Sequence, residues 1–251
     1  MSEKTLNYLA RSAMQSVAVI SIFALSLTDG SVLAEERMKA EDFMKQLAGD
    51  PEYQAMRQRK EAEQAKRSAM LDADEASLVA ELREARVRVV MNRIPGQEYD
   101  GLPNSVWDLV NTEEPYPQAI PILLKHLDAE HHLAIREGIV RALAVAEARD
   151  IATERLIEEF VKIEDPESNL KWVVGMAIAA TTTPKTGAKV AALALDKAHG
   201  KSRDQLPLGM LSADPDEASQ YLQQMLEDPV TKKSASEAIK KLAKRREAKS
   251  K

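Results

Sequence analysis

The sequence has no cysteine, four histidines, nine glycines and 4% aromatic residues, and these shortages narrow the possible functions. Without cysteine, the 251-residue chain cannot form disulfides, thiolate metal sites, iron–sulfur clusters or a cysteine nucleophile. Strand-favouring Val, Thr and aromatic residues are outnumbered by Ala, Leu, Glu and Lys, which favour helix. The composition therefore predicts an all-α fold with apolar mass for one large or two small domains.

The charged residues, 30% of the chain, are unevenly distributed. The net charge is −5, yet residues 232–251 carry nine basic and two acidic side chains, so the rest of the chain is acidic. An acidic body argues against nucleic acid as the partner. Basic side chains complement the dipole at a helix C-terminus, so we interpret residues 245–251 as a solvated basic tail.

Residues 1–37 have the order of a secretory signal: basic residues, then an apolar run over residues 13–27, then small residues at a cleavage position. The run is too short and too polar to give a stable membrane span. Translation from Met38 and an ordinary soluble helix are the alternatives, because an amphipathic helix begins at Met38. We expect a cytoplasmic protein, or an exported one if residues 1–34 act as a cleaved signal peptide.

Residues 38–92 predict a charged helical arm. A short helix should end near Gly49, and Asp50-Pro51 supplies the cap and first position of a second helix reaching about Arg86. Much of that helix is charged nearly all round, which is typical of a solvated helix. Residues 93–116 predict a connection and a capping helix anchored by Trp107.

Four helix pairs of about 33 residues each follow Pro117. The first helices share apolar pairs that start 33, 34 and 31 residues apart. The second helices each carry a basic residue, followed seven positions later by a large apolar residue that we expect to be buried. These basic residues are Arg136, Lys171, Arg203 and Lys232, and the apolar residues are Leu143, Ile178, Met210 and Ile239. Stacked pairs of this kind share a continuous core.

These residues resemble the HEAT-repeat family of α-solenoids over residues 117–244. The resemblance lies in the paired helices, in turns such as Asp165-Pro166, and in the basic residue near the start of each second helix. The segment beginning at Tyr116 is also similar to uncharacterised bacterial HEAT-repeat domain proteins. The resemblance implies an α-solenoid of about four helix pairs after the charged arm, and it implies no reaction. Pro207 departs from the pattern, because a proline at this position should kink or end the second helix of the third pair.

Catalytic motifs are missing from the sequence. It contains no P-loop, GxGxxG, GxSxG or HExxH pattern. His131 and His132 straddle a turn, with His126 five residues earlier, and this spacing is not that of a helical zinc pair. Adjacent acidic residues such as Glu158 and Glu159 fit a solvated helix face. We therefore expect no enzyme activity, no metal and no cofactor.

The four basic residues of the second helices could bind phosphate along one surface, but a structural role fits better. In a solenoid such residues pair with acidic turn residues of neighbouring repeats, and Asp128, Asp165 and Asp228 are placed to do so.

Trp172 is the best sequence-level pointer to a binding site. Its repeat equivalents, Glu137, Asp204 and Lys233, are all charged, which indicates a position open to water. Tryptophan and basic residues are over-represented where partners dock, so we expect a partner-binding surface formed by Trp172, Lys171, Arg136, Glu137 and Asp204. Substitution of an exposed Trp172 should hardly affect folding. The alternative is that Trp172 covers the groove between repeats as partial core.

The sequence therefore favours a non-catalytic protein-binding or scaffold module that uses the exposed face of the solenoid, with a protein partner. The alternative is a HEAT-like DNA-binding or base-excision protein, in which Trp172, Arg136 and Lys171 grip a duplex and Asp204 assists the chemistry.

Overall fold

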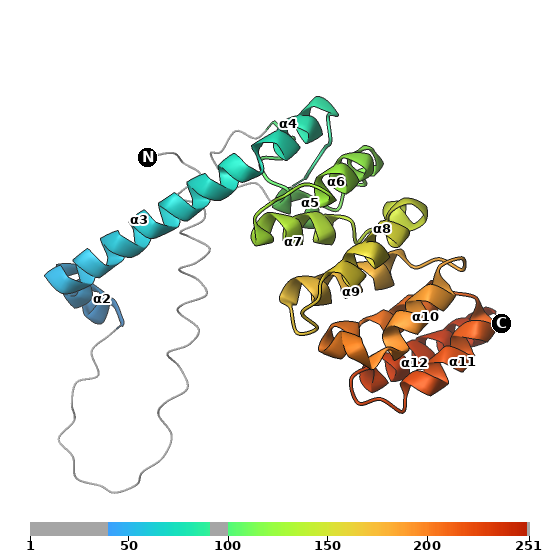
Figure 1. Cartoon of the computed structure of the whole chain (residues 1–251). Coiled ribbons are helices and arrows are strands. Elements are labelled where there is room, and N and C mark those ends of the chain that lie inside the picture. Colours follow the sequence, from blue (N-terminus) through green and yellow to red (C-terminus); the bar gives the residue numbers. More distant parts are fainter. Residues whose placement is uncertain (1–39, 91–99, 250–251) are drawn as a thin grey trace, which may run out of the picture. The chain divides into compact units, whose positions relative to one another are not determined.

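A computed structural model describes residues 40–90 and 100–249 (Figure 1). Every regular element among these residues is a helix, so the prediction of an all-α fold is confirmed. The chain divides into two compact units, residues 1–70 and 71–251. Within the described residues, none of the helices combines the length and the apolar character needed to cross a bilayer. The signal-like segment at residues 1–37 lies outside the described residues.

The first unit contains α2 (Ala40–Gly49) and most of α3 (Pro51–Asp74). As the sequence predicts, Asp50 caps the second helix: its Oδ1 accepts a hydrogen bond from the Glu52 backbone N–H at 2.8 Å. No side chain of α3 is buried, and its mid-section is bridged by an i,i+4 ion pair between Arg57 and Glu61. This solvated character agrees with the predicted charged arm.

The predicted arm does not remain one element up to residue 92. The helix breaks after Asp74, and α4 (Ala76–Glu84) belongs to the second unit, where Leu78 and Leu82 are fully buried. The break lies at Glu75, which is 4% exposed and whose carboxylate accepts hydrogen bonds from Ser105 Oγ and the Val106 N–H. Burial raises the pKa of Glu75.

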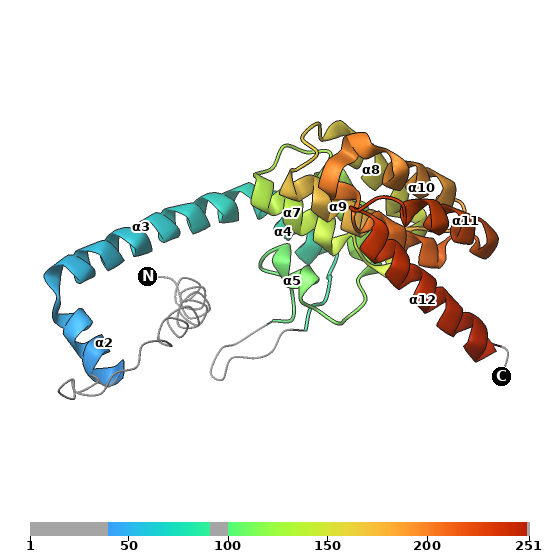
Figure 2. The ribbon, with the colours of Figure 1, turned by 90° about the horizontal axis from the view of Figure 1, so that it is seen from below.

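The second unit contains the predicted helix pairs, which run from green to red in Figure 1 and are seen from below in Figure 2. The short α5 (Trp107–Val110) and 3₁₀ segments η2 (Pro117–Ala119) and η3 (Ala146–Ala148) accompany them. The first helices are α6 (Ile120–Leu127), α8 (Arg149–Lys162), α10 (Gly187–Leu195) and α11 (Pro215–Met225). The second helices are α7 (Leu133–Ala142), α9 (Asn169–Thr181), the 3₁₀ segments η4 (Lys197–Arg203) and η5 (Leu206–Ser212), and α12 (Lys232–Lys249).

Contacts in this unit follow the order of the pairs. The two helices of each pair touch, as in α8 and α9 or α11 and α12. Second helices also touch in succession, α7 with α9, α9 with η5, and η5 with α12. Among the first helices, α6 touches α8 and α10 touches α11. A single hydrophobic core runs through all of these contacts.

The equivalent apolar positions of the second helices agree with the predicted register at three of four places. Leu143, Ile178 and Met210 are fully buried, whereas Ile239 on α12 is half-buried and packs against the same core. The expectation of equal burial is therefore wrong for the last pair.

The third pair departs from α-helical geometry, as Pro207 predicts. Two 3₁₀ segments replace one second helix, and the first of them, η4, is kinked at Gly200, whose φ of 53° is a conformation that side-chain-bearing residues rarely adopt. A Cβ on Gly200 would also lie 2.9 Å from Pro166 Cβ of the preceding pair. The close packing of the second and third pairs therefore requires a glycine at this irregular point of the backbone.

The predicted boundary between repeats and tail at residue 244 is not a structural boundary. α12 continues to Lys249, and its last turns contact η5 and α11 through polar groups. Arg245 donates to the Leu211 carbonyl at 2.8 Å, and Arg246 donates to the Pro215 carbonyl at 3.4 Å.

Candidate functional site

Trp172 lies on α9 as a half-buried side chain. This is intermediate between the exposed contact residue and the core residue that the sequence allowed. Its indole packs against the hydrophobic core, and its Nε1–H donates to Asp204 Oδ1 at 2.8 Å. The proximity of Trp172 and Asp204, predicted from neighbouring repeats, is therefore present. An indole held at both its apolar face and its N–H has a fixed orientation while part of the ring remains open to water.

A second hydrogen bond from α9 lies next to the one between Trp172 and Asp204, and it connects α9 to α7. Asn169, one turn before Trp172 on α9, donates to Glu137 Oε2 on α7 at 3.1 Å. Glu137 is in turn paired with Arg141 at 2.8 Å. We call Arg141, Glu137, Asn169, Trp172 and Asp204 the second-helix row. The sequence predicted Glu137, Trp172 and Asp204 together, but Arg141 and Asn169 were missed because no repeat pattern marks them.

Lys171 does not belong to this surface, so the expectation that it is exposed beside Trp172 is wrong. It is 2% exposed, and its Nζ donates to the Ile163 carbonyl at the end of α8 at 2.6 Å. The ammonium also lies 5.0 Å from the centre of the Phe160 ring. Burial lowers the pKa of Lys171. Consecutive residues on a helix point about 100° apart, so an open Trp172 places Lys171 toward the core.

Arg136 and Arg203 are likewise used inside the fold. Arg136 forms an ion pair with Glu159 of α8, which is buried although the sequence predicted a solvated face. Arg203 is 3% exposed; it donates to the Ala194 carbonyl at 3.0 Å and to Asp228 Oδ2 at 2.8 Å. The predicted pairing with an acidic turn residue of the next repeat is thus found for Arg203, whereas Arg136 takes a carboxylate from a first helix instead.

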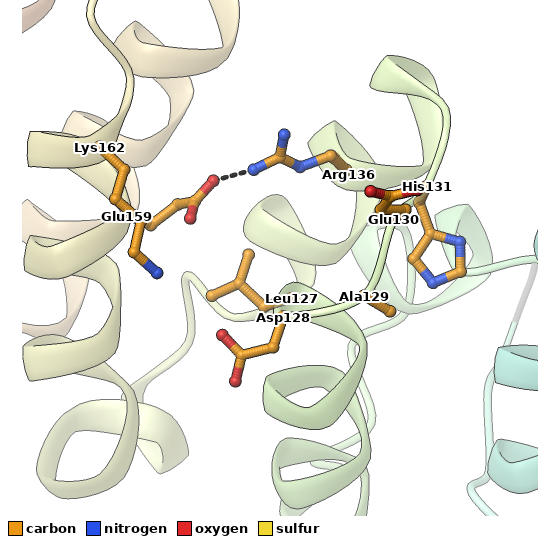
Figure 3. A pocket seen from close by; sticks show the side chains of 8 residues that line it. All are labelled: Leu127, Asp128, Ala129, Glu130, His131, Arg136, Glu159 and Lys162. Carbon is orange, nitrogen blue, oxygen red and sulfur yellow. Dashed lines mark hydrogen bonds and ion pairs between the residues drawn. The ribbon is translucent and has the colours of Figure 1, made fainter.

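A shallow pocket surrounds the ion pair of Arg136 (Figure 3). Arg136 reaches across it toward Glu159, while His131 points away from that pair, as the sticks in Figure 3 show. The lining consists mostly of polar and charged side chains: Leu127, Asp128, Ala129, Glu130, His131, Arg136, Glu159 and Lys162. The central cation and carboxylate neutralise each other, so the pocket presents mixed charge rather than a cationic phosphate site.

Two histidines of this region are in direct contact, which the sequence did not predict. His126 is 5% exposed, and its Nδ1 lies 3.0 Å from His131 Nε2. The outer nitrogens face carboxylates: His126 Nε2 lies 3.3 Å from Glu81 Oε1, and His131 Nδ1 lies 3.4 Å from Asp74 Oδ2. Within residues 40–90 and 100–249, no group of three or more His, Cys, Asp or Glu side chains is arranged to hold a metal ion. In the sequence, the contact between the two histidines is indicated only by their spacing of five residues across a turn.

No protein family, curated protein or solved structure matches this chain.

Trp172→Phe tests how firmly the indole is held. The phenyl ring keeps most of the apolar contact but loses the hydrogen bond to Asp204, so we expect the free energy of unfolding to fall by about 1 kcal/mol in urea denaturation. Trp172→Glu should cost more than Trp172→Phe, because it also removes the ring from the core. This replaces the expectation that an exposed Trp172 is dispensable for folding. Equal stability of wild type and both variants would show that the ring adds nothing to the core.

Proposed function

We propose that the second unit is a short α-solenoid of HEAT-like helix pairs that serves as a non-catalytic protein-binding or scaffold module. The successive contacts of the second helices, together with the contacts of α6 with α8 and of α10 with α11, support this proposal. Stacked pairs of this kind present one extended surface made by the second helices.

The observation that carries the proposal is the state of Trp172. It is a partly open aromatic ring at a position where the other pairs have Glu137, Asp204 and Lys233. Its hydrogen bond to Asp204 fixes the ring before any partner arrives, which lowers the entropy lost on binding. Fixed aromatic side chains near the centre of a contact surface commonly carry much of the binding energy.

The side chains around Trp172 indicate the chemistry of the partner. Asp204 uses Oδ1 for the indole, and Glu137 uses both carboxylate oxygens for Asn169 and Arg141. The row therefore offers an aromatic ring beside carboxylates. This suits a protein segment that presents an apolar anchor together with a basic side chain or another hydrogen-bond donor.

The nucleic-acid alternative has less support. Arg136 and Lys171, the two cations that it would place on a duplex, are occupied by Glu159 and by the Ile163 carbonyl. Phosphate contacts from free Lys and Arg side chains supply most of the affinity for nucleic acid. Arg136 and Lys171 are thus paired within the fold, and Arg141, the cation of the second-helix row, is paired with Glu137, so we favour a protein partner.

Capture of partners on immobilised full-length protein tests this function. We expect a partner retained by wild type to bind Trp172→Glu at least about 30-fold more weakly, which corresponds to the 2 kcal/mol or more of a central aromatic contact. The assay should use a temperature at which urea denaturation shows the variant to be fully folded. Isothermal titration with the captured partner then gives the change in Kd.

Val161→Glu is the matched control for this experiment. It introduces the same charge at a side chain that is 55% exposed on α8, a first helix. Binding should be unchanged, because the proposed surface belongs to the second helices. Loss of binding in Val161→Glu with full binding in Trp172→Glu would assign the surface to the first helices and contradict the proposal.

A further inference from the structure

α9 is enclosed on all sides except along one stripe. All of its residues are buried apart from Asn169, Trp172, Met176, Ala179 and Ala180. Residues three or four apart lie on the same face of an α-helix, so these five form a single open stripe. Apart from Asn169 at its start, the stripe is apolar.

The neighbouring segment η5 has an open stripe of the same character. Its residues are buried apart from Leu208, Leu211 and Ser212. A 3₁₀-helix has three residues per turn, so Leu208 and Leu211 lie one above the other. η5 touches α9, and the hydrogen bond from Trp172 to Asp204 joins the starts of the two stripes.

Two glycines explain why large apolar side chains remain at this surface. A Cβ on Gly175 of α9 would lie 2.6 Å from the Ser202 carbonyl oxygen, and a Cβ on Gly209 of η5 would lie 2.5 Å from Thr182 Oγ1. Backbones this close leave no space between them for a large side chain, so the large side chains stay beside the contact, partly open to water. We call Trp172, Met176, Leu208 and Leu211 the α9–η5 seam.

Open charges are missing from these two elements. The chain is 30% charged, yet Asn169–Thr181 and Leu206–Ser212 together contain one charged residue, Lys171, and it is buried. A helix face that only meets water in such a chain carries charged side chains, as the first helix α8 does. An apolar centre without charge is typical of the middle of a protein–protein contact surface.

Charged side chains border the seam. The α7 side carries the ion pair of Glu137 with Arg141. On the α12 side, Arg245 donates to the Leu211 carbonyl at 2.8 Å. Asp204 lies directly before η5 and Arg245 reaches its last turn, so the seam has one negative and one positive end.

A helix fits this surface better than an extended segment. The described residues contain no strand, so they offer no strand edge with which an extended chain could pair. A helical ligand presents apolar side chains at i, i+3 or i+4, and i+7, and these form a ridge. Such a ridge packs into the groove between the side-chain rows of neighbouring helices.

We propose that the α9–η5 seam binds an amphipathic helix of a partner protein, with a basic residue of that helix at Asp204 and an acidic residue at Arg245. This inference rests on the proposed function, and it specifies the form and the direction of the partner. Within the described residues, Asp204 holds the indole through Oδ1, while Oδ2 has no partner and can accept from the basic residue.

Selection of peptides on the immobilised full-length protein tests the proposal. The probe is a random library of peptides of about 18 residues, or roughly five helical turns. We expect the enriched peptides to share apolar residues at i, i+3 or i+4, and i+7, between a basic residue at one end and an acidic residue at the other. Carbon chemical shifts of a labelled peptide should show a helix in the bound state.

Met176→Gln and Leu208→Gln test the position of the peptide. Each variant should weaken its Kd at least about tenfold in isothermal titration, because the ligand leaves a polar amide buried without hydrogen bonds. Ile157→Gln is the matched control, since it makes a similar change at a half-buried apolar residue of α8, a first helix. Its Kd should equal that of wild type. Urea denaturation identifies a temperature at which all three variants are folded.

Arg245→Glu tests the direction of the peptide. It should weaken binding at least about threefold, and a peptide whose acidic residue is replaced by lysine should regain the loss. Lys240→Glu is the matched control, because it makes the same charge change on α12 at an exposed residue that points about 140° away from Arg245. Equal effects of the two variants would show that the peptide has no fixed direction.

Other results would overturn the proposal in distinguishable ways. Binding lost in Trp172→Glu but kept in Met176→Gln and Leu208→Gln would leave the proposed function standing and remove the seam. Peptides insensitive to all three variants, or a selection without binders, would remove the seam as a docking surface, while partner capture on Trp172→Glu still tests the proposed function separately. Chemical shifts of an extended chain in the bound peptide would contradict the helical partner.

Discussion

Arg203→Met is expected to lower the free energy of unfolding by about 3–5 kcal/mol, because it removes one partner of a buried ion pair. Arg203 and Asp228 have side chains that are 4% and 12% exposed, and 2.8 Å separates Nη2 from Oδ2. Methionine fills much of the space of the arginine stem but donates no hydrogen bond. Both the Asp228 carboxylate and the Ala194 carbonyl would lose a donor.

Lys189→Met provides the matched control, since it removes an ion pair between two first helices in the same unit. Lys189 and Glu154 lie 2.7 Å apart, but their side chains are 59% and 53% exposed. We expect this variant to differ from wild type by less than about 1 kcal/mol, because water solvates both charges when they are separated. Urea denaturation of the two variants measures the comparison. Equal losses would show that Arg203 behaves as a surface charge.

The same pair predicts a sensitivity to acid. The Val230 backbone N–H, and then the Arg203 guanidinium, lower the pKa of Asp228. A carboxyl group with a lowered folded-state pKa contributes stability above its unfolded value near about 3.9, and this contribution is lost as pH falls through the folded value. Asp228→Asn should therefore flatten the stability profile below about pH 4 while preserving an oxygen acceptor for Arg203.

The sequence predicted the helix pairs because each pair repeats the same burial requirement. Large apolar residues recur seven positions after a basic residue, and a helical period converts that spacing into one buried face. Pro207 predicted the departure in the third pair, since its ring excludes regular helical hydrogen bonding whatever the tertiary context. These features depend on local chemistry, which a single sequence contains.

The candidate site was less predictable because it depends on which side chains meet. The charge pattern of the repeat correctly placed Trp172 beside Asp204, but it also suggested an exposed Lys171. The structure buries that amine against the Ile163 carbonyl and the Phe160 ring. Likewise, Glu81 and Asp74 reach the two histidines from helices about 45 and 57 residues away in the chain, and no local pattern records such a contact.

Leu143→Ala is expected to destabilise the protein by about 2–5 kcal/mol, through lost apolar burial and the cavity that remains. Leu143 follows α7 directly and is fully buried, like Ile178 and Met210 at the equivalent positions. A leucine enclosed on all sides leaves a void that its neighbours fill only in part. Urea or thermal denaturation, monitored by helical circular dichroism, measures the loss.

Ile239→Ala on α12 is the control that tests the repeat itself. The side chain occupies the same position in the last pair but is half-buried, and α12 packs against α11 and η5. The truncated side chain leaves a site that water can enter, so little cavity forms and the cost should be roughly half that of Leu143→Ala. If Ile239→Ala proved as costly as Leu143→Ala, the four positions would be equally enclosed, and the graded burial of the last helix pair would be wrong.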